Sequence, residues 1–422
     1  MKRKNIFKSL LAAAMALIMI FGAAPLSGFV GIRLPMLSLK AEAAPTEDGL
    51  FEYAMASHRT ESGYQYGLSI TRYKGPDSGE VVIPKTIEGY EVKWIGDRAF
   101  QNCTGITSVV IPDGVMRIGE FVFSGCTSLA EITVSPDNKN FSSVDGVLFS
   151  KDMSTLLIYP SSNKHSSYTV PDGVTKIGNY AFDHCKNLTE ITIPDSVTEI
   201  DNYNFYYCNL LSKVQLFNGL TKIGNYAFDH CKNLTEITIP DSVTKIGDDA
   251  FYNCTSLSKV QLSNGLTKIG NYAFYCCTSL TEITIPDSVT EIGRRAFEYC
   301  DLLSKVQLSS KLIKIDEEAF YGCKSLKEIT IPDSVTEIGN EVFANCKSLS
   351  KVRLSNNLAK IGDKAFSSCT NLEEITIPAS VSYIGKLVLA FCSSLTDITV
   401  SPDNKNYLSI DGVLFNKEES VL

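Results

Sequence analysis

Cysteine is the residue type in this chain whose spacing points most directly to chemistry, because a thiol can form a disulfide, bind a metal or act as a nucleophile. The chain has 422 residues and thirteen cysteines. Twelve of them follow a 23-residue step that is broken once. These are Cys103, Cys126, Cys185, Cys208, Cys231, Cys254, Cys277, Cys300, Cys323, Cys346, Cys369 and Cys392. A residue type that returns at such a period indicates stacked structural repeats.

The neighbours of these cysteines favour a ladder of buried free thiols over disulfides. Most of the cysteines follow a Phe by three residues and precede a Leu by three, as in Phe182-x-x-Cys185-x-x-Leu188. A small hydrophobic residue at one position of every repeat is typical of an interior. Neighbouring thiols would lie about 5 Å apart, the spacing of adjacent strands, so disulfide pairing is the alternative. Cys276 lies off the step and is the candidate for an exposed, reactive thiol.

No group of residues has the spacing of a catalytic or metal site. His184 and His230 occupy one repeat position two coils apart, about 10 Å by strand spacing, with Tyr207 between them, which is too far for one metal ion. The other two histidines, His58 and His165, lie outside the regular repeats. No Ser or Cys has a nucleophile-elbow context, and no glycine-rich phosphate loop follows a strand. The acidic residues recur with the repeat, whereas a catalytic pair would occur once. We therefore expect no catalytic, cofactor-binding or metal-binding residues and a protein that is not an enzyme.

The coil around Cys185 shows the elements that each repeat supplies. Leu188, Ile191 and Ile193 are predicted to point inward, and the β-branched Ile-x-Ile alternation predicts a short strand. Pro194 ends this strand, because proline cannot donate a hydrogen bond to a sheet. The Ala-Phe-x-x-Cys segment predicts a helical or 3₁₀ turn whose Phe fills the coil. Strands separated by such a return path stack in parallel, which predicts a β-rich repeat solenoid.

The repeated pattern Ile-Gly-x-x-Ala-Phe-x-x-Cys-x-x-Leu-x-x-Ile-x-Ile-Pro, as at 177–194, resembles the bacterial surface-antigen (BspA-like) class of leucine-rich repeat. The resemblance runs from about Ile70 to the end of the chain, and 64–96 resembles the family's N-terminal cap. It implies right-handed leucine-rich-repeat-like coils with a parallel sheet and short helical or 3₁₀ turns. It also implies a cell-surface role in adhesion. The last coil departs from the pattern, because Leu389 replaces the Phe.

The first 43 residues are predicted to be a secretory signal peptide. They combine a basic start, an apolar run from Leu10 to Ala24, and a small-residue cleavage site at Ala41-Glu42-Ala43. An uncleaved membrane anchor is the alternative, but the run is short for a span. No second stretch of spanning length follows, so we expect a secreted or cell-surface protein with no membrane span after cleavage. The remaining chain has 33 basic and 46 acidic residues, a net charge of −13, which disfavours nucleic acid as a partner.

Five further segments are predicted beyond the signal peptide. They are an N-terminal region and cap (44–96), two leucine-rich repeats (97–134), a β-hairpin-type insertion (135–170), ten leucine-rich repeats (171–400) and the start of a second insertion (401–422). Asp145-Gly146 is the hairpin signal in the first insertion. The second insertion stops at Leu422, before the counterpart of 158–160, so we expect a truncated chain. Residues 175–198 and 221–244 are identical, which indicates duplication of a two-coil unit.

A charged row is the first candidate ligand surface. The position five residues after the cysteine alternates between Glu and Lys, so neighbouring strands would pair opposite charges, each pair worth about 0.2–1 kcal/mol. We expect this ladder on the concave face, where it either keeps the coils in register or binds a protein. Its members are Glu190, Lys213, Glu236, Lys259, Glu282, Lys305, Glu328, Lys351 and Glu374.

Two sets of tyrosines are the second candidate. Five residues before the cysteine lie Tyr180, Tyr203, Tyr226 and Tyr272, and two residues before it lie Tyr206, Tyr252, Tyr275 and Tyr321. Stacked tyrosines offer rigid amphipathic contact area for a glycan or a partner protein. The alternative is that they only cover the flank of the solenoid.

The leading functional hypothesis is an exported, non-enzymatic binding protein that mediates adhesion through a protein or glycan ligand at a cell surface. One alternative is a recognition or spacer region of a larger secreted enzyme, whose catalytic or anchoring module would lie beyond residue 422. Another is a structural component of a surface layer.

Overall fold

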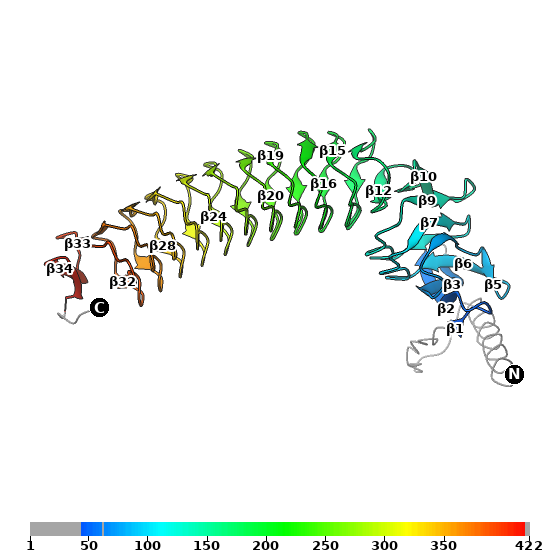
Figure 1. The fold of residues 1–422 in the computed structure, drawn as a ribbon, viewed down its shortest axis with the longest axis horizontal. Coiled ribbons are helices and arrows are strands. Elements are labelled where there is room, and N and C mark those ends of the chain that lie inside the picture. The colour runs from blue at the N-terminus through cyan, green and yellow to red at the C-terminus, as the bar shows by residue number, and fades with distance from the viewer. Residues whose placement is uncertain (1–43, 61–62, 418–422) are drawn as a thin grey trace, which may run out of the picture. The chain divides into compact units, whose positions relative to one another are not determined.

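The computed structural model describes residues 44–60 and 63–417, so the predicted signal peptide lies outside the described residues. All regular elements in this part of the chain are β-strands, and successive coils stack side by side (Figure 1). The strands of neighbouring repeats pair in parallel, with registers such as Lys176↔Glu199. The predicted β-rich solenoid with parallel sheets is therefore confirmed. Within the described residues, no helix is long and apolar enough to cross a membrane.

The N-terminal part contains two sheets. In the larger sheet, a long antiparallel hairpin (β2 and β3) joins the solenoid through the parallel pairs β3–β6 and β6–β8. Its strands are β1 (Ala44–Pro45), β2 (Phe51–Thr60), β3 (Gly63–Tyr73), β5 (Thr86–Ile87), β6 (Tyr90–Ile95) and β8 (Arg117–Ile118). The smaller sheet contains β4 (Gly79–Val82), β7 (Ile106–Ile111) and β9 (Glu131–Val134). The hairpin thus covers the first coil, which has no preceding neighbour.

One two-residue strand from each later coil joins a continuous 13-stranded sheet. The sheet starts with three strands of the insertion, β10 (Phe141–Val144), β11 (Val147–Ser150) and β12 (Thr155–Ile158). It continues with β14 (Lys176–Ile177), β16 (Glu199–Ile200), β18 (Lys222–Ile223), β20 (Lys245–Ile246), β22 (Lys268–Ile269), β24 (Glu291–Ile292), β26 (Lys314–Ile315), β28 (Glu337–Ile338), β30 (Lys360–Ile361) and β32 (Tyr383–Ile384).

The Ile-x-Ile segments form the second series of strands, which is divided into shorter sheets. The first sheet contains β13 (Ser167–Thr169), β15 (Glu190–Ile193), β17 (Lys213–Leu216), β19 (Glu236–Thr238) and β21 (Lys259–Gln261). Three pairs follow: β23 (Glu282–Thr284) with β25 (Lys305–Gln307), β27 (Glu328–Thr330) with β29 (Lys351–Arg353), and β31 (Glu374–Ile377) with β33 (Asp397–Val400). The chain then forms the antiparallel hairpin β34 (Tyr407–Ile410) and β35 (Val413–Asn416).

The Ala-Phe-x-x-Cys segments form consecutive turns instead of the predicted helical or 3₁₀ turns. We number positions in each coil from its cysteine, so that position −5 lies five residues before it. The residue at −5 has a φ of 52–58° in every coil, and the residue at −1 has a φ of 55–75°. A left-handed residue cannot continue a right-handed helix. The helical part of the prediction is therefore wrong for the described residues.

Phenylalanine at position −3 forms the centre of the core. From Phe182 to Phe366 these rings are fully buried, and successive ring centroids lie 4.9–5.6 Å apart. Leu188, Ile191 and Ile193 are buried as predicted. Burial of one such side chain contributes about 1.5–3 kcal/mol, so the interior supplies most of the stability of each coil.

The insertion divides the interior into two hydrophobic cores. Val147 and Phe149 of β11 lie in the core of the later coils, whereas Leu148 lies in the core of the N-terminal part. Successive side chains of a strand point to opposite faces, so β11 is buried on both sides. Asp145 and Gly146 join β10 to β11 with φ values of 50° and 79°, which suit a two-residue hairpin turn.

The end of the insertion forms an additional coil without a cysteine. Tyr159 lies 23 residues before Phe182 and stacks on it, with the ring centroids 5.0 Å apart. β13 pairs with β15 at the same offset, as in Ser167↔Glu190. The cysteine pattern does not reveal this coil, because Ser162 occupies the cysteine position.

Candidate functional site

The eight candidate tyrosines, which we call the tyrosine surface, form one interrupted strip along the coils. Three members at position −5 stack directly: Tyr180 on Tyr203 at 4.8 Å between ring centroids, and Tyr203 on Tyr226 at 4.5 Å. Asp249 occupies the next −5 position and separates Tyr226 from Tyr272. The structure therefore brings three of the four −5 tyrosines into one stack.

The tyrosines at position −2 form a shorter stack. Tyr252 and Tyr275 lie parallel, with ring centroids 4.6 Å apart. Tyr206 is separated from this pair by Asp229, and Tyr321 is separated from it by Glu298. The two sets of tyrosines touch at Tyr203–Tyr206, 5.6 Å apart, and at Tyr272–Tyr275, 5.8 Å apart.

All eight rings are half-buried, because each ring covers the turn beneath it and packs on its neighbours. Burial raises the pKa of Tyr206 and Tyr226 to about 12, and it also raises the pKa of Tyr180, Tyr252 and Tyr275. These five hydroxyls therefore stay protonated at physiological pH. The exposed part of this surface consists of ring edges and neutral hydroxyl groups that can donate or accept a hydrogen bond.

Acidic side chains, two of them buried and one half-buried, lie between the tyrosines. Burial raises the pKa of Asp229 and Glu298 to about 7, and of Asp249 to about 6. Asp229 and Glu298 are only 5% and 3% exposed. A basic side chain, Arg295, lies 3.3 Å from Glu298 and stacks over Tyr272. The strip thus combines aromatic rings with carboxyl groups that change charge near neutral pH.

Two residues that are not tyrosines extend the tyrosine surface at position −5, and they were not identified from the sequence. Phe121 occupies the −5 position of its coil and packs on Tyr180, with ring centroids 4.3 Å apart. Arg98 occupies the same position one coil earlier and lies over the ring of Phe121. The position relative to the cysteine would have identified both residues, whereas a search by residue type does not.

The Glu/Lys row lies on the second series of strands, and all nine members are exposed. The strand registers place opposite charges side by side, as in Glu190↔Lys213 and Lys213↔Glu236. Among the described residues, the Glu190–Lys213 pair at 3.7 Å is the one ion pair formed within the row. A depression of about 220 Å³ lies over Lys213, Glu236 and Lys259. The row is therefore a neutral, polar surface with little electrostatic contribution to stability.

The family model described as the BspA type leucine rich repeat region matches in six copies over residues 158–236, 200–324 and 291–420, which is more than half of the chain. The chain belongs to this family. The resemblance drawn from the repeat pattern is therefore confirmed, and membership makes the chain a repeat protein of a protein-recognition type.

Three solved structures are among those similar to this chain. A leucine-rich repeat protein from Bacteroides ovatus is 30% identical, with a TM-score of 0.60, over 83% of this chain and 88% of that chain. A leucine rich cell surface protein from Faecalibacterium prausnitzii is 30% identical, with a TM-score of 0.48, over 84% and 94% of the two chains. A leucine-rich repeat protein from Eubacterium ventriosum is 26% identical, with a TM-score of 0.46, over 52% and 64%. A comparison with curated proteins gives no match.

The cysteines of this BspA-type chain are all free. From Cys126 onward, each thiol on the 23-residue step except that of Cys185 donates to the carbonyl oxygen of a Phe in the preceding coil, at 3.0–3.3 Å. Cys185 points to Tyr159 O at 3.8 Å. Cys276 is half-buried, and burial raises its pKa, so the expectation of an exposed thiol there is wrong.

The two repeat histidines stack on opposite faces of one tyrosine. Tyr207 lies 5.2 Å from His184 and 4.1 Å from His230 between ring centroids, with the planes nearly parallel. Within residues 44–60 and 63–417, no group of three or more His, Cys, Asp or Glu side chains could hold a metal ion.

Proposed function

We propose that this chain is an exported, non-enzymatic adhesion protein that binds a protein partner at a cell surface through the tyrosine surface. The observation that carries the proposal is the contiguous stack of Tyr180, Tyr203 and Tyr226, whose half-buried rings are held in place before a partner arrives. The basic and apolar N-terminal sequence supports export, because it has the pattern of a secretory signal.

Prior ordering of the rings favours recognition. A tyrosine that is already packed loses little side-chain entropy when a partner binds, so its contact area contributes more fully to affinity. Tyrosine is also among the residues that dominate measured interface energies. The chain belongs to a leucine-rich-repeat family of a protein-recognition type, which favours a protein over a glycan as the partner.

We assign a different role to the Glu/Lys row. Its exposed charges alternate and form few close pairs, so a strongly charged partner would meet attraction and repulsion in equal measure. The row instead disfavours a shift of one coil against the next, because a slipped register would separate the opposite charges on neighbouring strands. It therefore serves as the matched control surface for binding experiments.

Binding to immobilised fibronectin, laminin and collagen tests the proposal. We expect the variant with Tyr203→Ser, Tyr226→Ser and Tyr272→Ser to lose at least about tenfold in affinity for any matrix protein that the natural chain binds, which corresponds to about 1.4 kcal/mol. The control variant replaces Lys213, Lys259 and Lys305 with Ser and should bind like the natural chain.

Circular dichroism and thermal melting must show that both variants keep the fold. Unchanged affinity of the folded tyrosine variant would reject the tyrosine surface as the contact. If the natural chain binds none of the matrix proteins but binds a glycan array, the choice of a protein partner is overturned.

A further inference from the structure

A regular ladder of backbone hydrogen bonds joins neighbouring coils. The N–H groups at positions −5, −3 and −1 donate to the carbonyl groups at −6, −4 and −2 of the next coil, at 2.7–3.4 Å. All three bonds form at the Cys103–Cys126 step and at every step from Cys185 to Cys392. The ladder is therefore a property of the repeat and does not depend on the residue types at these positions.

The ladder is open where the insertion enters. Among the described residues, no partner is found for the N–H groups of Phe121 and Phe123 or for the carbonyl groups of Asn179 and Asp183. The carbonyl between these two acceptors, that of Ala181, is occupied by the N–H of Tyr159 at 2.7 Å. In the described part of the chain, the third ladder donor of this coil, the N–H of Gly125, is also without a partner but lies outside the cavity lining. The lining thus contains two open donors from one coil and two separated acceptors from the other. Asn179 is exposed, and Phe121 and Asp183 are half-buried, so these peptide groups are open to water or to a ligand.

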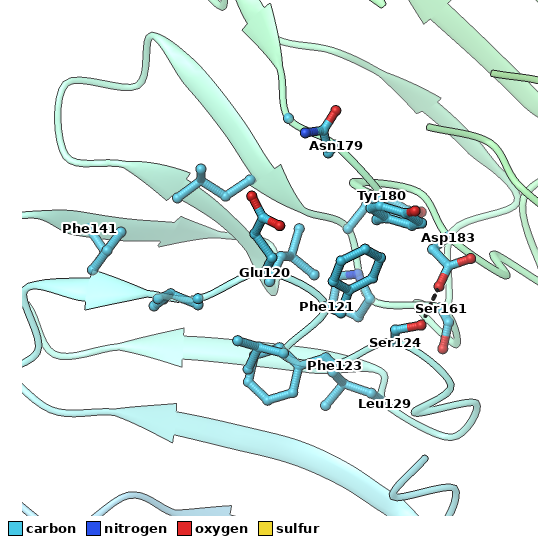
Figure 2. Close-up of a pocket in the computed structure, with 18 residues that line it drawn as sticks. Glu120, Phe121, Phe123, Ser124, Leu129, Phe141, Ser161, Asn179, Tyr180 and Asp183 are labelled. Carbon is cyan, nitrogen blue, oxygen red and sulfur yellow. Dashed lines mark hydrogen bonds between the residues drawn. The ribbon is translucent and has the colours of Figure 1, made fainter. Parts of the chain in front are cut away.

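A cavity of about 240 Å³ lies at this opening (Figure 2). Two contacts bound one side of it, the Phe121–Tyr180 ring pair and the 3.1 Å hydrogen bond from Ser124 Oγ to Asp183 Oδ2 (Figure 2). Apolar side chains line the interior, including Leu129, which is buried. The cavity therefore has an apolar interior with polar groups at defined places, which is the usual composition of a small-molecule site.

The glycine at position −7 gives an independent measure of the opening. At regular coils a Cβ added to this glycine would meet the neighbouring coil at 2.4–3.0 Å, as at Gly247 and Gly270. At Gly178, which lines the cavity, the nearest atom would lie at 3.4 Å, an ordinary contact distance. The preceding coil therefore leaves more space beside this glycine than at the regular coils, although the hydrogen bond from Gly178 N–H to Leu156 O has an ordinary length of 2.9 Å.

We propose that this cavity binds a neutral sugar ring of monosaccharide size. Each sugar hydroxyl both donates and accepts a hydrogen bond, so one ring can satisfy the Phe121 and Phe123 N–H groups and the Asn179 and Asp183 carbonyl groups. The aromatic and apolar lining suits the C–H faces of the ring. A volume of about 240 Å³ is below the roughly 300–1,000 Å³ of drug-sized sites, which matches a single ring.

Charge and geometry exclude two other classes of ligand. The charged lining residues are Glu120 and Asp183, and none is basic, so a phosphate or an acidic sugar would be repelled. An extended peptide would need a continuous row of free acceptors, but Tyr159 occupies the central one at Ala181. A compact ligand reaches the acceptors on either side of Tyr159, whereas a strand does not.

Saturation-transfer NMR with the full chain tests this site. The probes are glucose, galactose, mannose and N-acetylglucosamine, with glucuronate and tri-alanine as the acidic and peptide comparisons. We expect at least one neutral sugar to bind with millimolar or better affinity. Gly178→Val, which adds bulk to the cavity wall, should weaken that binding at least tenfold, whereas Asn179→Ala keeps the backbone carbonyl group and should leave it unchanged.

Asn233→Ala is the matched control, because Asn233 is an exposed asparagine on a regular coil outside the cavity lining. It should leave sugar binding unchanged, and thermal melting should show all three variants folded. Failure of every neutral sugar to bind would overturn the proposal, as would full affinity in folded Gly178→Val. Binding of tri-alanine alone would identify a peptide site instead. None of these variants changes the eight tyrosines, so the adhesion proposal is tested separately.

Discussion

The identical segments 175–198 and 221–244 show how much of a repeat's chemistry comes from its neighbours. In the first segment, Asp183 accepts a hydrogen bond from Ser124 beside the cavity. In the second, its counterpart Asp229 lies between the rings of neighbouring coils, and burial raises its pKa to about 7. Twenty-four identical residues thus form the same coil but two different local environments.

The paired histidines differ in the same way. A hydrogen bond to Asp183 raises the pKa of His184, whereas burial lowers the pKa of His230. The His184 side chain is 36% exposed and the His230 side chain 16%. The amide of Asn253 in the next coil lies 3.1 Å from His230 Nε2. An amide nitrogen can only donate, so this contact requires an unprotonated Nε2 and favours the neutral imidazole.

The largest expected effect is the loss of stability when the core phenylalanine of either segment is replaced. Comparing the two losses tests whether the two segments are equally well packed inside. Phe182 and Phe228 are both fully buried and both stack on Phe205, at 4.9 and 5.0 Å. Replacing either by Ala should lower the free energy of unfolding by about 3–5 kcal/mol, because the substitution removes apolar contacts and leaves a cavity. Denaturant unfolding followed by circular dichroism measures both losses. A clear difference between the two variants would show that the segments differ in their cores as well as on their surfaces.

A smaller change in stability is expected when the glycine at position −7 of each segment is replaced by alanine. The difference between the two variants tests the opening beside the first segment. A Cβ on Gly224 would meet backbone atoms at 2.7 Å, so Gly224→Ala should destabilise the protein by about 1–3 kcal/mol. At the identical position in the first segment, Gly178→Ala should be neutral or stabilise by up to about 1 kcal/mol, because alanine reduces the entropy of the unfolded chain. Thermal melting and amide hydrogen exchange compare them. Equal destabilisation would mean that the coils are as close at Gly178 as elsewhere.

The regular part of this fold could be predicted from the sequence because each position repeats. The inward residues of the strand, the buried thiol and the parallel stacking all follow from one period, which averages out local ambiguity. The left-handed residues could not be predicted in this way. Tyrosine and arginine rarely adopt positive φ, and these residues adopt it at −5 because the coil requires a sharp turn there.

The irregular features escaped prediction for a different physical reason. Tyr159 continues the Phe ladder, but its coil lacks both the Phe and the Cys that identify the others. The cavity has no sequence signal, because it arises where an irregular coil fails to fill the space between two regular ones. The repeat pattern of the sequence describes each coil by itself, so it does not reveal a poor fit between neighbouring coils. The candidate tyrosines could be found by residue type, whereas their interruption by acids required the structure.

The smallest expected effect is a difference between the pKa values of His184 and His230, the histidines of the two identical segments. NMR titration of the imidazole signals should place the pKa of His184 above the ordinary value of about 6.5 and the pKa of His230 below it. His184→Gln and His230→Gln assign the two signals. Identical titration of the two rings would contradict the difference drawn between the segments.

The raised pKa of Asp229 makes the stability of the folded protein depend on pH. Asp229 binds its proton more tightly in the folded state than in the unfolded state, since burial raises its pKa to about 7 from the ordinary value near 4. The folded state therefore holds the extra proton between these two values, and stability falls as the pH rises through this window. Asp229→Asn has no proton to lose, so its melting temperature should fall less between pH 5 and pH 8 than that of the natural chain. Asp249 and Glu298, whose pKa values burial raises to about 6 and about 7, keep part of the pH dependence in both proteins. The carboxylate of Asp229 also lies within hydrogen-bonding distance of His230 Nδ1. An unchanged pH dependence in Asp229→Asn would show that Asp229 is ionised in the folded protein and that this contact offsets its burial.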